Sequence, residues 1–369
     1  TRDWPALRVH ECFERIVDRQ PADPAIVGGP GEATYAELDR RANALAWTLL
    51  IQGVAPEEPV GVLTERSGQL PLAFLAILKA GAAYVPMGAD LPPQRLANMA
   101  AQCGMRFLIA LDGLPVPEEL SSALSAHAAP PDHPANLRIT LSSAPGYEVQ
   151  THAAATSVLR PEALSAEALD RGLRRPQRRG EIDALAAILF TSGSTGQPKG
   201  VLLQHDACLN MAFGHIEAHG ITPRDRILLA SAPGFILGFR ELCLPLLAGA
   251  ASVPVSRQLL DHPAQLIEDM ARQGVTVAMF TPSYLHLMRG AVPAGLRCLL
   301  TAGERPIAAD ARAYARQLDY WNIHGATEVC GTICMQRVDP DGEGPLASGR
   351  PFVNSSVYSL DAHGREVPR

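Results

Sequence analysis

The sequence has no excess of basic residues, no apolar run of membrane-spanning length and no C-x-x-C pair. Its 32 Lys and Arg against 38 Asp and Glu give a formal net charge of −6, which leaves no basic footprint for nucleic acid. The apolar runs fall well short of the ~20 residues that cross a bilayer, and the polar residues 1–4 do not open a signal sequence. We therefore expect small-molecule or protein partners, with no nucleic acid and no membrane.

The seven cysteines are odd in number and scattered along the chain. This pattern favours reduced thiols over a disulfide framework or a zinc site, and it predicts a cytoplasmic location. No internal repeat of fixed period occurs. With 369 residues the chain can bury a large core, which we expect as two lobes of one catalytic unit. Because the chain does not begin with Met, we expect it to be a piece of a longer protein.

What the sequence does contain is a glycine- and hydroxyl-rich turn between two apolar runs, residues 184–190 and 201–203. Glycines in the turn let backbone N–H groups converge on an anion, hydroxyls add donors, and Lys199 adds a mobile positive charge. The turn predicts a polyphosphate-binding loop. Its expected ligand-binding residues are Thr191, Ser192, Gly193, Ser194, Thr195, Gly196 and Lys199.

Two other interpretations of this turn compete with that prediction. A Walker loop requires Gly-Lys-Ser/Thr at the start of a helix, but here Pro198 precedes the lysine, Gly200 follows it, and a strand-like run comes next. We therefore reject a P-loop NTPase. The other alternative is a surface loop with an incidental lysine, and the density of the pattern over residues 189–201 argues against it.

Alternating strand and helix patterns predict an α/β fold whose parallel sheets are built from βαβ units. Thr34 and Glu37 form a capping-box pattern that starts a helix over residues 35–52. In the first half we expect strands at 59–63, 83–85 and 106–110 and helices at 72–79 and 93–102. After the glycine-rich turn we expect strands at 227–231, 252–255, 275–280, 296–301 and 320–323 and helices at 238–248, 262–273, 283–289 and 306–317.

The stretch 111–180 is the least regular part of the chain, rich in Ala, Pro and Ser. We interpret it as a surface excursion with one strand pair at 137–141 and 147–149. One lobe is placed at residues 1–180 and the second at 181–340. Residues 341–369 are expected to begin a further β region.

A second polar cluster follows the strand expected at 320–323, at the carboxyl end where ligands lie in open α/β sheets. Asn322 offers a donor and an acceptor for an adenine edge, His324 a flat ring for stacking, and Thr327 a hydroxyl for phosphate. Glu328 offers a carboxylate to Mg²⁺. His324 on its own would be interpreted as a buried core histidine, but its place in this cluster favours a binding role.

The turn at 189–201 and the segment 321–328 together resemble the signatures of the acyl-adenylate-forming superfamily, which includes nonribosomal-peptide adenylation domains, acyl- and aryl-CoA ligases and luciferases. Segments 33–38 and 78–86 are similar to adenylation domains of peptide synthetases in particular. The second motif departs from the family pattern Asn-x-Tyr-Gly-Pro-Thr-Glu at His324 and Ala326. These departures leave Gly325, Thr327 and Glu328 in place.

The resemblance implies an adenylate-forming core of two wound sheet lobes with a small β region near the C-terminus. It implies activation of a carboxylic acid by ATP and Mg²⁺ as an acyl-AMP, followed by transfer to the phosphopantetheine thiol of a peptidyl-carrier protein, with other synthetase domains adjacent. Because the chain stops at Arg369, before the family's later motifs, we expect the C-terminal lid lobe to be absent and this piece alone to be weakly active or inactive.

The resemblance also implies roles for residues at matching positions. The catalytic residues would be Lys199, Thr327 and Glu328, with Glu328 holding Mg²⁺. The nucleotide would contact Gly303, Glu304, Asn322, His324, Gly325, Ala326 and Thr327 besides the glycine-rich turn. The acyl pocket would be Phe235, Ile236, Leu237, Arg240, Met279, Leu300, Ala302, Ile323, Gly331 and Thr332. Residues 349–351 and 357–361 match the strand that leads to the family's later motifs.

Two pocket positions are unusual. The aspartate that the family uses to pair with an α-ammonium falls at Ile236, and an ammonium buried against isoleucine would lose its partner at a cost of several kcal/mol. We therefore expect an α-keto, α-hydroxy, aryl or short acyl acid. Arg240 needs a partner in such an apolar pocket: Glu241, another carboxylate of the protein, or an acidic or carbonyl oxygen of the substrate. An ion pair within the protein is the favoured interpretation.

Several alternatives stay open. A free-standing acyl- or aryl-CoA ligase would perform the same activation with CoA as the acceptor, and a degenerate fold would only bind a carrier or another domain. His205, Cys208 and Asn210 form a polar cluster that we interpret as capping and packing residues. Cys330 and Cys334 show no adjacent base and are expected in the core.

Overall fold

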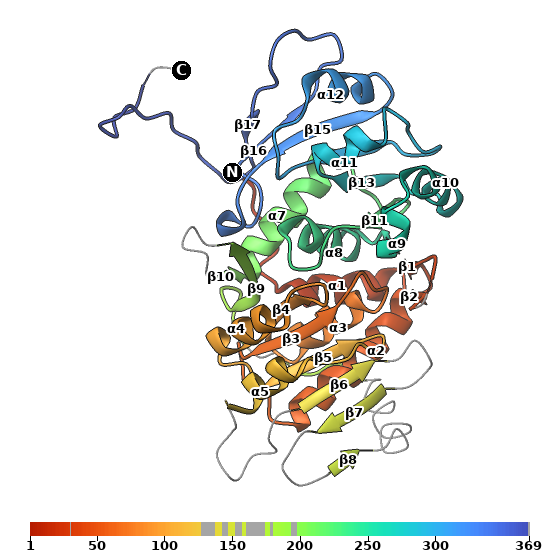
Figure 1. Ribbon diagram of the computed structural model, residues 1–369, viewed down its shortest axis with the longest axis vertical. Coiled ribbons are helices and arrows are strands. Elements are labelled where there is room, and N and C mark those ends of the chain that lie inside the picture. Colours follow the sequence, from red (N-terminus) through yellow and green to blue (C-terminus); the bar gives the residue numbers. More distant parts are fainter. Residues whose placement is uncertain are drawn as a thin grey trace.

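The computed structural model describes residues 1–29, 31–126, 174–177, 180–192 and 198–367, together with the backbone of 137–141, 147–151 and 157–159. One sheet occupies the upper half of the molecule and a second sheet the lower half, with helices between them (Figure 1). This arrangement is the two-lobed α/β fold that the sequence predicts.

The upper sheet is parallel over its six central strands and has antiparallel strands at both edges. Its order is β17-β16-β15-β14-β13-β11-β12-β1-β2. The strands are β1 Pro24–Ile26, β2 Ala33–Thr34, β11 Arg226–Leu229, β12 Ala251–Pro254, β13 Val277–Phe280, β14 Cys298–Thr301, β15 Asp319–His324, β16 Cys334–Arg337 and β17 Arg350–Pro351. The expected strands of the second half are confirmed as β11 to β15, with ends that differ by up to two residues.

The lower sheet has the order β10-β9-β4-β3-β5-β6-β7-β8 and is parallel from β9 to β6. Its strands are β3 Pro59–Thr64, β4 Ala83–Gly88, β5 Phe107–Leu111, β6 Leu137–Leu141, β7 Tyr147–Thr151, β8 Ser157–Leu159, β9 Leu185–Ser192 and β10 Pro198–Gln204. β6 and β7 form the antiparallel pair that the sequence predicts within 111–180.

The helices follow the strands in βαβ order. They are α1 Val9–Arg19, α2 Tyr35–Ile51, α3 Leu70–Lys79, α4 Pro93–Cys103, α5 Glu118–Ala126, α7 His205–His219, α8 Ile236–Ala248, α9 Arg257–Leu260, α10 Pro263–Gln273, α11 Pro282–Leu287, α12 Ala308–Ala315 and the 3₁₀ turn η2 Thr327–Val329. Helix α2 begins as predicted: Thr34 Oγ1 accepts a hydrogen bond from the backbone N–H of Glu37, and Glu37 Oε2 accepts one from the backbone N–H of Thr34.

Sheet membership crosses the boundary expected at residue 180. β9 and β10, which follow that boundary, join the lower sheet, whereas β1 and β2, from the start of the chain, form the far edge of the upper sheet. Ile26 in β1 pairs with Ser252 in β12, so the N-terminal segment connects the two lobes. A division of the chain by sequence alone therefore differs from the division between the sheets.

The interior between the sheets is one large apolar cluster built from α1, α2, α3, α7, α8 and strands of both sheets. Helix α8 contacts α1, α3, α7, β11 and β12, and Figure 1 shows it in the middle of the molecule. All of its residues except Ala248 are buried. Its N-terminus at Ile236 therefore lies where both lobes meet.

The end of the described chain departs from the upper sheet as an extended segment (Figure 1). Arg350–Pro351 forms β17 against β16 as expected. Residues 357–361, expected as a strand, form only the bridge between Leu360 and Glu366. No described part of the chain packs over Tyr358 and Leu360, which are 64% and 56% exposed, so this segment lacks the neighbours that a strand needs.

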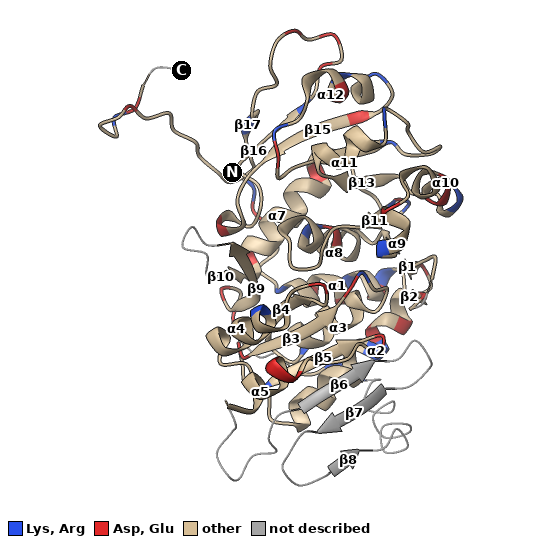
Figure 2. Cartoon of the chain, viewed as in Figure 1, with Lys and Arg blue, Asp and Glu red and all other residues tan. Residues whose placement is uncertain are grey.

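In the view of Figure 2, segments coloured for Lys and Arg and segments coloured for Asp and Glu are interspersed along the described ribbon of both lobes. This distribution agrees with the small net charge of the sequence.

Candidate functional site

The glycine-rich turn joins the two strands of a hairpin at the edge of the lower sheet. β9 and β10 pair antiparallel, with Thr191 opposite Lys199 and Ser192 opposite Pro198. Thr191 is half-buried, and Ser192 and Lys199 are exposed. The remaining predicted loop residues, Gly193, Ser194, Thr195 and Gly196, lie outside the described residues.

The second motif runs from the end of β15 into η2. Asn322 is buried and donates through Nδ2 to the Ala347 carbonyl at 3.2 Å, so one of its donors is already used within the protein. His324, at the end of the strand, is exposed, as are Gly325 and Ala326. The exposed ring of His324 does not belong to the core.

The two motifs meet, because β10 contacts η2. Lys199 on β10 and Glu328 on η2 are both exposed, and neither forms an ion pair with another residue that the structure describes. A free ammonium and a free carboxylate therefore lie on adjoining segments of the upper and lower lobes. Such groups can bind the opposite charges of a metal-complexed polyphosphate.

The turn after β14 approaches the start of α8. Gly303 has φ +88°, and a Cβ at this position would lie 3.3 Å from Phe235 Cζ, so glycine suits both the backbone and the contact. Phe235 is 42% exposed. Glu304 Oε2 accepts hydrogen bonds from the backbone N–H and the hydroxyl of Ser283, which anchors the turn to α11.

The segment after β15 folds back on itself at two glycines. A Cβ on Gly325 would lie 2.3 Å from the Gly331 carbonyl oxygen and 2.8 Å from Thr332 Cα, which is closer than real contacts allow. Gly331 has φ +93°, and a Cβ there would lie 2.6 Å from Ile236 Cγ1 and 3.0 Å from Arg240 Nη2. The nucleotide motif, the 331–332 turn and α8 are thus in direct contact.

The predicted acyl-pocket residues come together at this junction. Met279, Leu300 and Trp321 are cross-strand neighbours in β13, β14 and β15, and alternation places Ala302 and Ile323 on the same face. Phe235 apart, every pocket residue is buried. Six of them belong to the core cluster between the sheets: Ile236, Leu237, Met279, Leu300, Ala302 and Ile323.

The expectation that Arg240 forms an ion pair within the protein is wrong for the described residues, since neither Glu241 nor another described carboxylate pairs with it. Arg240 Nη2 donates to the Gly331 carbonyl at 2.9 Å and to Thr332 Oγ1 at 2.8 Å. Glu241 instead accepts hydrogen bonds from the backbone N–H groups of Ala230 and Ser231, both at 2.8 Å, and from Ser231 Oγ at 2.7 Å. Adjacent residues of a helix do not face each other, so the two charges lie in different environments.

Burial dominates the titration of both groups. It lowers the pKa of Arg240 to about 10, which leaves the guanidinium protonated at neutral pH. It raises the pKa of Glu241 to about 7, against the opposing effect of the hydrogen bonds from Ser231 and Ala230. The residues predicted to line the acyl pocket therefore include a buried cation, and the adjacent carboxylate of Glu241 is bound by Ala230 and Ser231.

Two further pocket neighbours, His215 and His219, were not found by sequence reasoning. His215 Nε2 lies 2.8 Å from Thr332 Oγ1, and His215 Nδ1 lies 2.9 Å from His219 Nε2. Burial and the charge of Arg240 lower the pKa of both imidazoles, that of His219 to about 3, so both are neutral. Their spacing of four residues on α7 was the available signal, since such positions share one helix face.

The other polar candidates have structural roles, as expected. His205 Nδ1 accepts a hydrogen bond from the Val9 N–H, and Asn210 Oδ1 accepts one from Trp4 Nε1. A hydrogen bond with Cys330, together with burial, raises the pKa of Cys208 well above its usual value. Cys330 and Cys334 are buried. None of these thiols has the character of a nucleophile.

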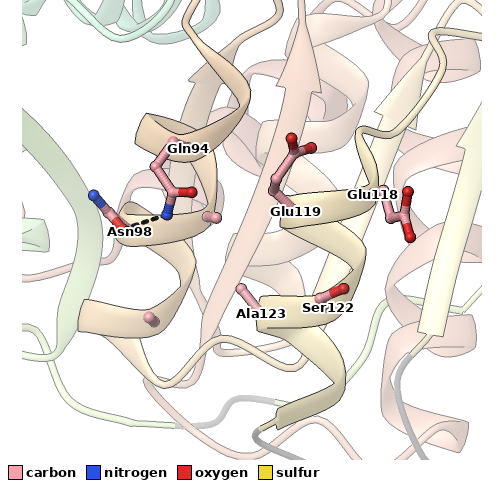
Figure 3. A pocket seen from close by; sticks show the side chains of 8 residues that line it. Gln94, Asn98, Glu118, Glu119, Ser122 and Ala123 are labelled. Carbon is pink, nitrogen blue, oxygen red and sulfur yellow. Dashed lines mark hydrogen bonds between the residues drawn. The ribbon is translucent and has the colours of Figure 1, made fainter.

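A surface crevice between α4 and α5 is separate from these motifs. Gln94, Asn98, Glu118, Glu119 and Ser122 are among the residues that line it (Figure 3). Gln94 Nε2 donates to Asn98 Oδ1 at 3.1 Å. None of the predicted site residues lines this crevice, and no argument for chemistry attaches to it.

The geometry agrees with comparison to known proteins. A family model described as "AMP-binding enzyme" matches residues 13–369. The chain belongs to the AMP-binding enzyme family. A linear gramicidin synthase of Brevibacillus parabrevis is 34% identical to this AMP-binding chain over 366 residues, and phosphinothricin tripeptide synthetase PhsC of Streptomyces viridochromogenes is 31% identical over 360 residues.

Solved structures show the same fold. The nonribosomal peptide synthetase FmoA3 in its alpha-methyl-L-serine-AMP bound form superposes with a TM-score of 0.79 at 24% identity, over 100% of this chain and 39% of that one. The AMP-binding chain aligns over 98% of its length with both curated relatives but spans 4% of that gramicidin synthase and 30% of PhsC. The predicted resemblance to the adenylate-forming superfamily is confirmed.

Within the described part of the AMP-binding chain, the helices are too short or too polar to cross a membrane. In the same part, no group of three or more His, Cys, Asp and Glu side chains is arranged so that it could hold a metal ion. The carboxylate of Glu328 stays the candidate ligand for the expected Mg²⁺.

Proposed function

We propose that the chain activates a carboxylic acid as an acyl adenylate and passes the acyl group to a phosphopantetheine thiol of a carrier protein. In the first step a carboxylate oxygen attacks the α-phosphorus of ATP, and pyrophosphate leaves with the electrons of the broken P–O bond. In the second step the thiolate sulfur attacks the acyl carbon, and AMP leaves. The acid and ATP are the only reactants of the first step.

The observation that carries this proposal is the convergence of four segments at the ends of the upper strands. The Gly303 turn lies against Phe235, and the Gly331 turn lies against Ile236 and Arg240. The strand of Lys199 contacts η2, which carries Glu328. The apolar residues proposed to hold the acid, the turn proposed to hold the nucleotide and a pair of free charges therefore adjoin one another, as in-line attack of a bound acid on a bound nucleotide requires.

Charge stabilisation is the expected contribution of Lys199 and Glu328. Lys199 is free to bind the β- and γ-phosphates, with Thr191 and Ser192 as hydroxyl donors at the described end of the loop. Glu328 suits Mg²⁺, which commonly takes one or two protein carboxylates and completes its octahedral shell with water and phosphate oxygens. The bound ion would neutralise charge on the phosphate oxygens.

The nucleotide base is expected on the opposite side of the same junction. Gly303 leaves backbone groups open beside the ring of Phe235, and the exposed His324 supplies a flat imidazole for stacking. Asn322 retains its side-chain oxygen and one N–H besides the hydrogen bond to Ala347. Gly325 and Ala326 keep the intervening backbone uncovered.

The acid is proposed to lack an α-ammonium group. Ile236 occupies the position where the family has a pairing aspartate, and the carboxylate of Glu241 is held by Ala230 and Ser231. None of the described pocket residues offers a carboxylate to a buried cation. An amino acid would therefore bind with its ammonium unpaired.

A carrier protein is the proposed acceptor, because the similar proteins include peptide synthetases such as PhsC. A CoA ligase would use the same pocket and nucleotide site. The two are separated by supplying the intact protein with ATP and acid, then with either CoA or a phosphopantetheinylated carrier. Faster thioester formation on CoA would refute the carrier proposal.

Acid-dependent exchange of radiolabelled pyrophosphate into ATP tests the activation step. We expect exchange with at least one acid from a panel of matched keto, hydroxy, aryl, aliphatic and amino acids. An absence of exchange across the panel with the intact, folded protein would favour a binding domain without catalysis. A preference for the amino acid would refute the argument from Ile236.

A further inference from the structure

Arg240 is a buried cation whose donors are only partly used. Its side chain is 1% exposed, and both of its hydrogen bonds, to the Gly331 carbonyl and to Thr332 Oγ1, leave from Nη2. Nε is buried and has no hydrogen-bond partner among the described residues. A guanidinium carries five N–H donors, so part of its hydrogen-bonding capacity has no acceptor among the described residues.

Among the described residues, no neighbouring group forms an ion pair with this charge. Glu241 accepts its three hydrogen bonds from Ala230 and Ser231, which follow β11. Thr332 and the Gly331 carbonyl are neutral acceptors. A buried charge ordinarily has a counter-ion, and none of the described carboxylates lies within ion-pairing distance of Arg240. The charge pattern points to an anion that is not part of this protein.

The guanidinium is held in position from behind. It can only donate, so Thr332 Oγ1 accepts from it, and the threonine hydroxyl proton is left to donate to His215 Nε2 at 2.8 Å. His215 Nδ1 can then donate to His219 Nε2 at 2.9 Å. This chain of neutral groups fixes the orientation of Thr332, and with it one edge of Arg240, without supplying charge.

Arg240 lies one helical turn beyond Ile236 on the same face of α8. Residues four apart on a helix are neighbours, and the positions that a Cβ on Gly331 would crowd, Ile236 Cγ1 and Arg240 Nη2, lie on that face. Four residues span about 6 Å along a helix. A substrate that enters past Ile236 therefore reaches the guanidinium with its distal end.

We propose that the acid activated at this site is a short-chain dicarboxylic acid whose second carboxylate binds Arg240. This inference rests on the proposed function, since one carboxylate must react with ATP while the other is held in the pocket. The second carboxylate supplies the missing counter-ion and accepts the N–H donors that the protein leaves unused. Arg240 is then the residue that determines specificity for the distal end of the acid.

The test is pyrophosphate exchange by the intact protein with glutarate, pentanoate and glutaric acid monoamide as matched probes. We expect kcat/KM for glutarate to exceed that for pentanoate by about 30-fold or more, the factor associated with a lost buried charge pair. Arg240→Met should lower kcat/KM for glutarate by a similar factor and leave or raise that for pentanoate. The monoamide should behave like pentanoate in the wild type.

Arg272→Met is a matched control, because Arg272 on α10 is 74% exposed at its side chain and is not one of the pocket residues. It should leave all three rates unchanged. The wild-type ratio of glutarate to pentanoate needs no variant, so the proposal is tested even if Arg240→Met fails to fold. A wild-type preference for pentanoate, or an Arg240→Met protein with an unchanged ratio, would overturn the dicarboxylate assignment while leaving acid activation intact. An absence of pyrophosphate exchange by the wild-type protein with every acid would instead overturn the proposed function.

Discussion

Arg240 and Glu241 are consecutive on α8, and their side chains bind different segments of the chain. Arg240 Nη2 donates to Thr332 Oγ1 at 2.8 Å, whereas Glu241 Oε2 accepts from the Ser231 N–H at the same distance. The cation is therefore bound to the turn at 331–332, whereas the carboxylate fastens α8 to the end of β11. Specificity and scaffold are therefore divided between two neighbouring residues.

Glu241 is expected to make stability depend on pH. Burial raises its pKa from 4.5 to about 7, so the unfolded chain releases this proton at a lower pH than the folded chain does. The stability that the protonated form contributes is present below about pH 4.5 and is lost as the pH rises through about 7. The shift of this pKa corresponds to about 3 kcal/mol of unfolding free energy between the two ends of the pH range.

Glu241→Gln should remove this dependence. Its amide oxygen can accept from Ala230 and Ser231, and its amide N–H can donate to Ser231 Oγ. Urea unfolding at pH 5 and pH 8 would measure the free energy of unfolding of both proteins. Relative to wild type, the variant should be more stable at pH 8 than at pH 5. Parallel pH profiles for the two proteins would show that Glu241 does not titrate in this range.

Lys199 and Lys79 are the two lysines of the sequence, and they should respond to mutation in opposite ways. Lys199→Met should lower pyrophosphate exchange by about 10²–10³-fold, the usual effect of removing a group that stabilises transition-state charge. The melting temperature of the Lys199→Met variant should equal that of the wild type, because Lys199 is exposed and forms no ion pair with the described chain.

Lys79→Met supplies the contrast. Lys79 is buried and forms ion pairs with Glu14 and Asp39, so its loss should cost about 3 kcal/mol of stability. The fraction that stays folded should retain exchange activity. Calorimetry and exchange assays on both variants would check this, and equal loss of stability in the two proteins would contradict it.

Gly325→Ala tests the contact between the nucleotide motif and the pocket. The added Cβ would meet the Gly331 carbonyl at 2.3 Å, and backbone cannot move aside as a flexible side chain can. We expect a loss of about 1–3 kcal/mol in stability and a rise in KM for both ATP and acid, because the 331–332 turn contacts both sides of the site.

Gly234→Ala is the control for that change. A Cβ on Gly234 would lie 3.7 Å from its nearest neighbour, the Pro86 carbonyl oxygen, which is ordinary contact. Chemical denaturation and steady-state kinetics should show little effect. Equal effects of the two substitutions would mean that the close approach at Gly325 does not matter.

The sequence could predict the features that arise from local pattern. The Thr34 capping box, the apolar runs on either side of the glycine-rich turn and the alternation of strands and helices all depend on short-range rules. It could not show that β1 and β2 cross to the upper sheet, because strand pairing over more than 200 residues leaves no local signal. Helix α1 was not among the expected elements although its buried residues recur at helical spacing. Only its packing on α8 depends on contacts distant in sequence.

The sequence could predict the site residues that belong to a family motif. It could not predict hydrogen-bond partners that depend on the tertiary structure. Lys199 and Glu328 were placed by motif, and the structure brings their segments together. The partner of Arg240 was mistaken because residues i and i+1 of a helix face different directions. His215 and His219 carried a helical spacing in the sequence, but their role depends on Thr332, more than a hundred residues away.

Restoring an acidic residue at Ile236 should change substrate class only if Arg240 is also replaced. In Ile236→Asp alone, the introduced carboxylate would lie one turn from the guanidinium on the same face of α8 and would pair with it. Activation of dicarboxylic acids should fall, with no gain for amino acids.

In the double variant Ile236→Asp with Arg240→Met, the carboxylate is left free to bind an α-ammonium. Pyrophosphate exchange with an aliphatic amino acid should then rise above that of either single variant. The interaction of the two changes in a double-mutant cycle measures the pairing. If the single variant Ile236→Asp already activates amino acids as well as the double variant, the two side chains do not meet, and the arrangement of α8 against the Gly331 turn cannot be the basis of selectivity.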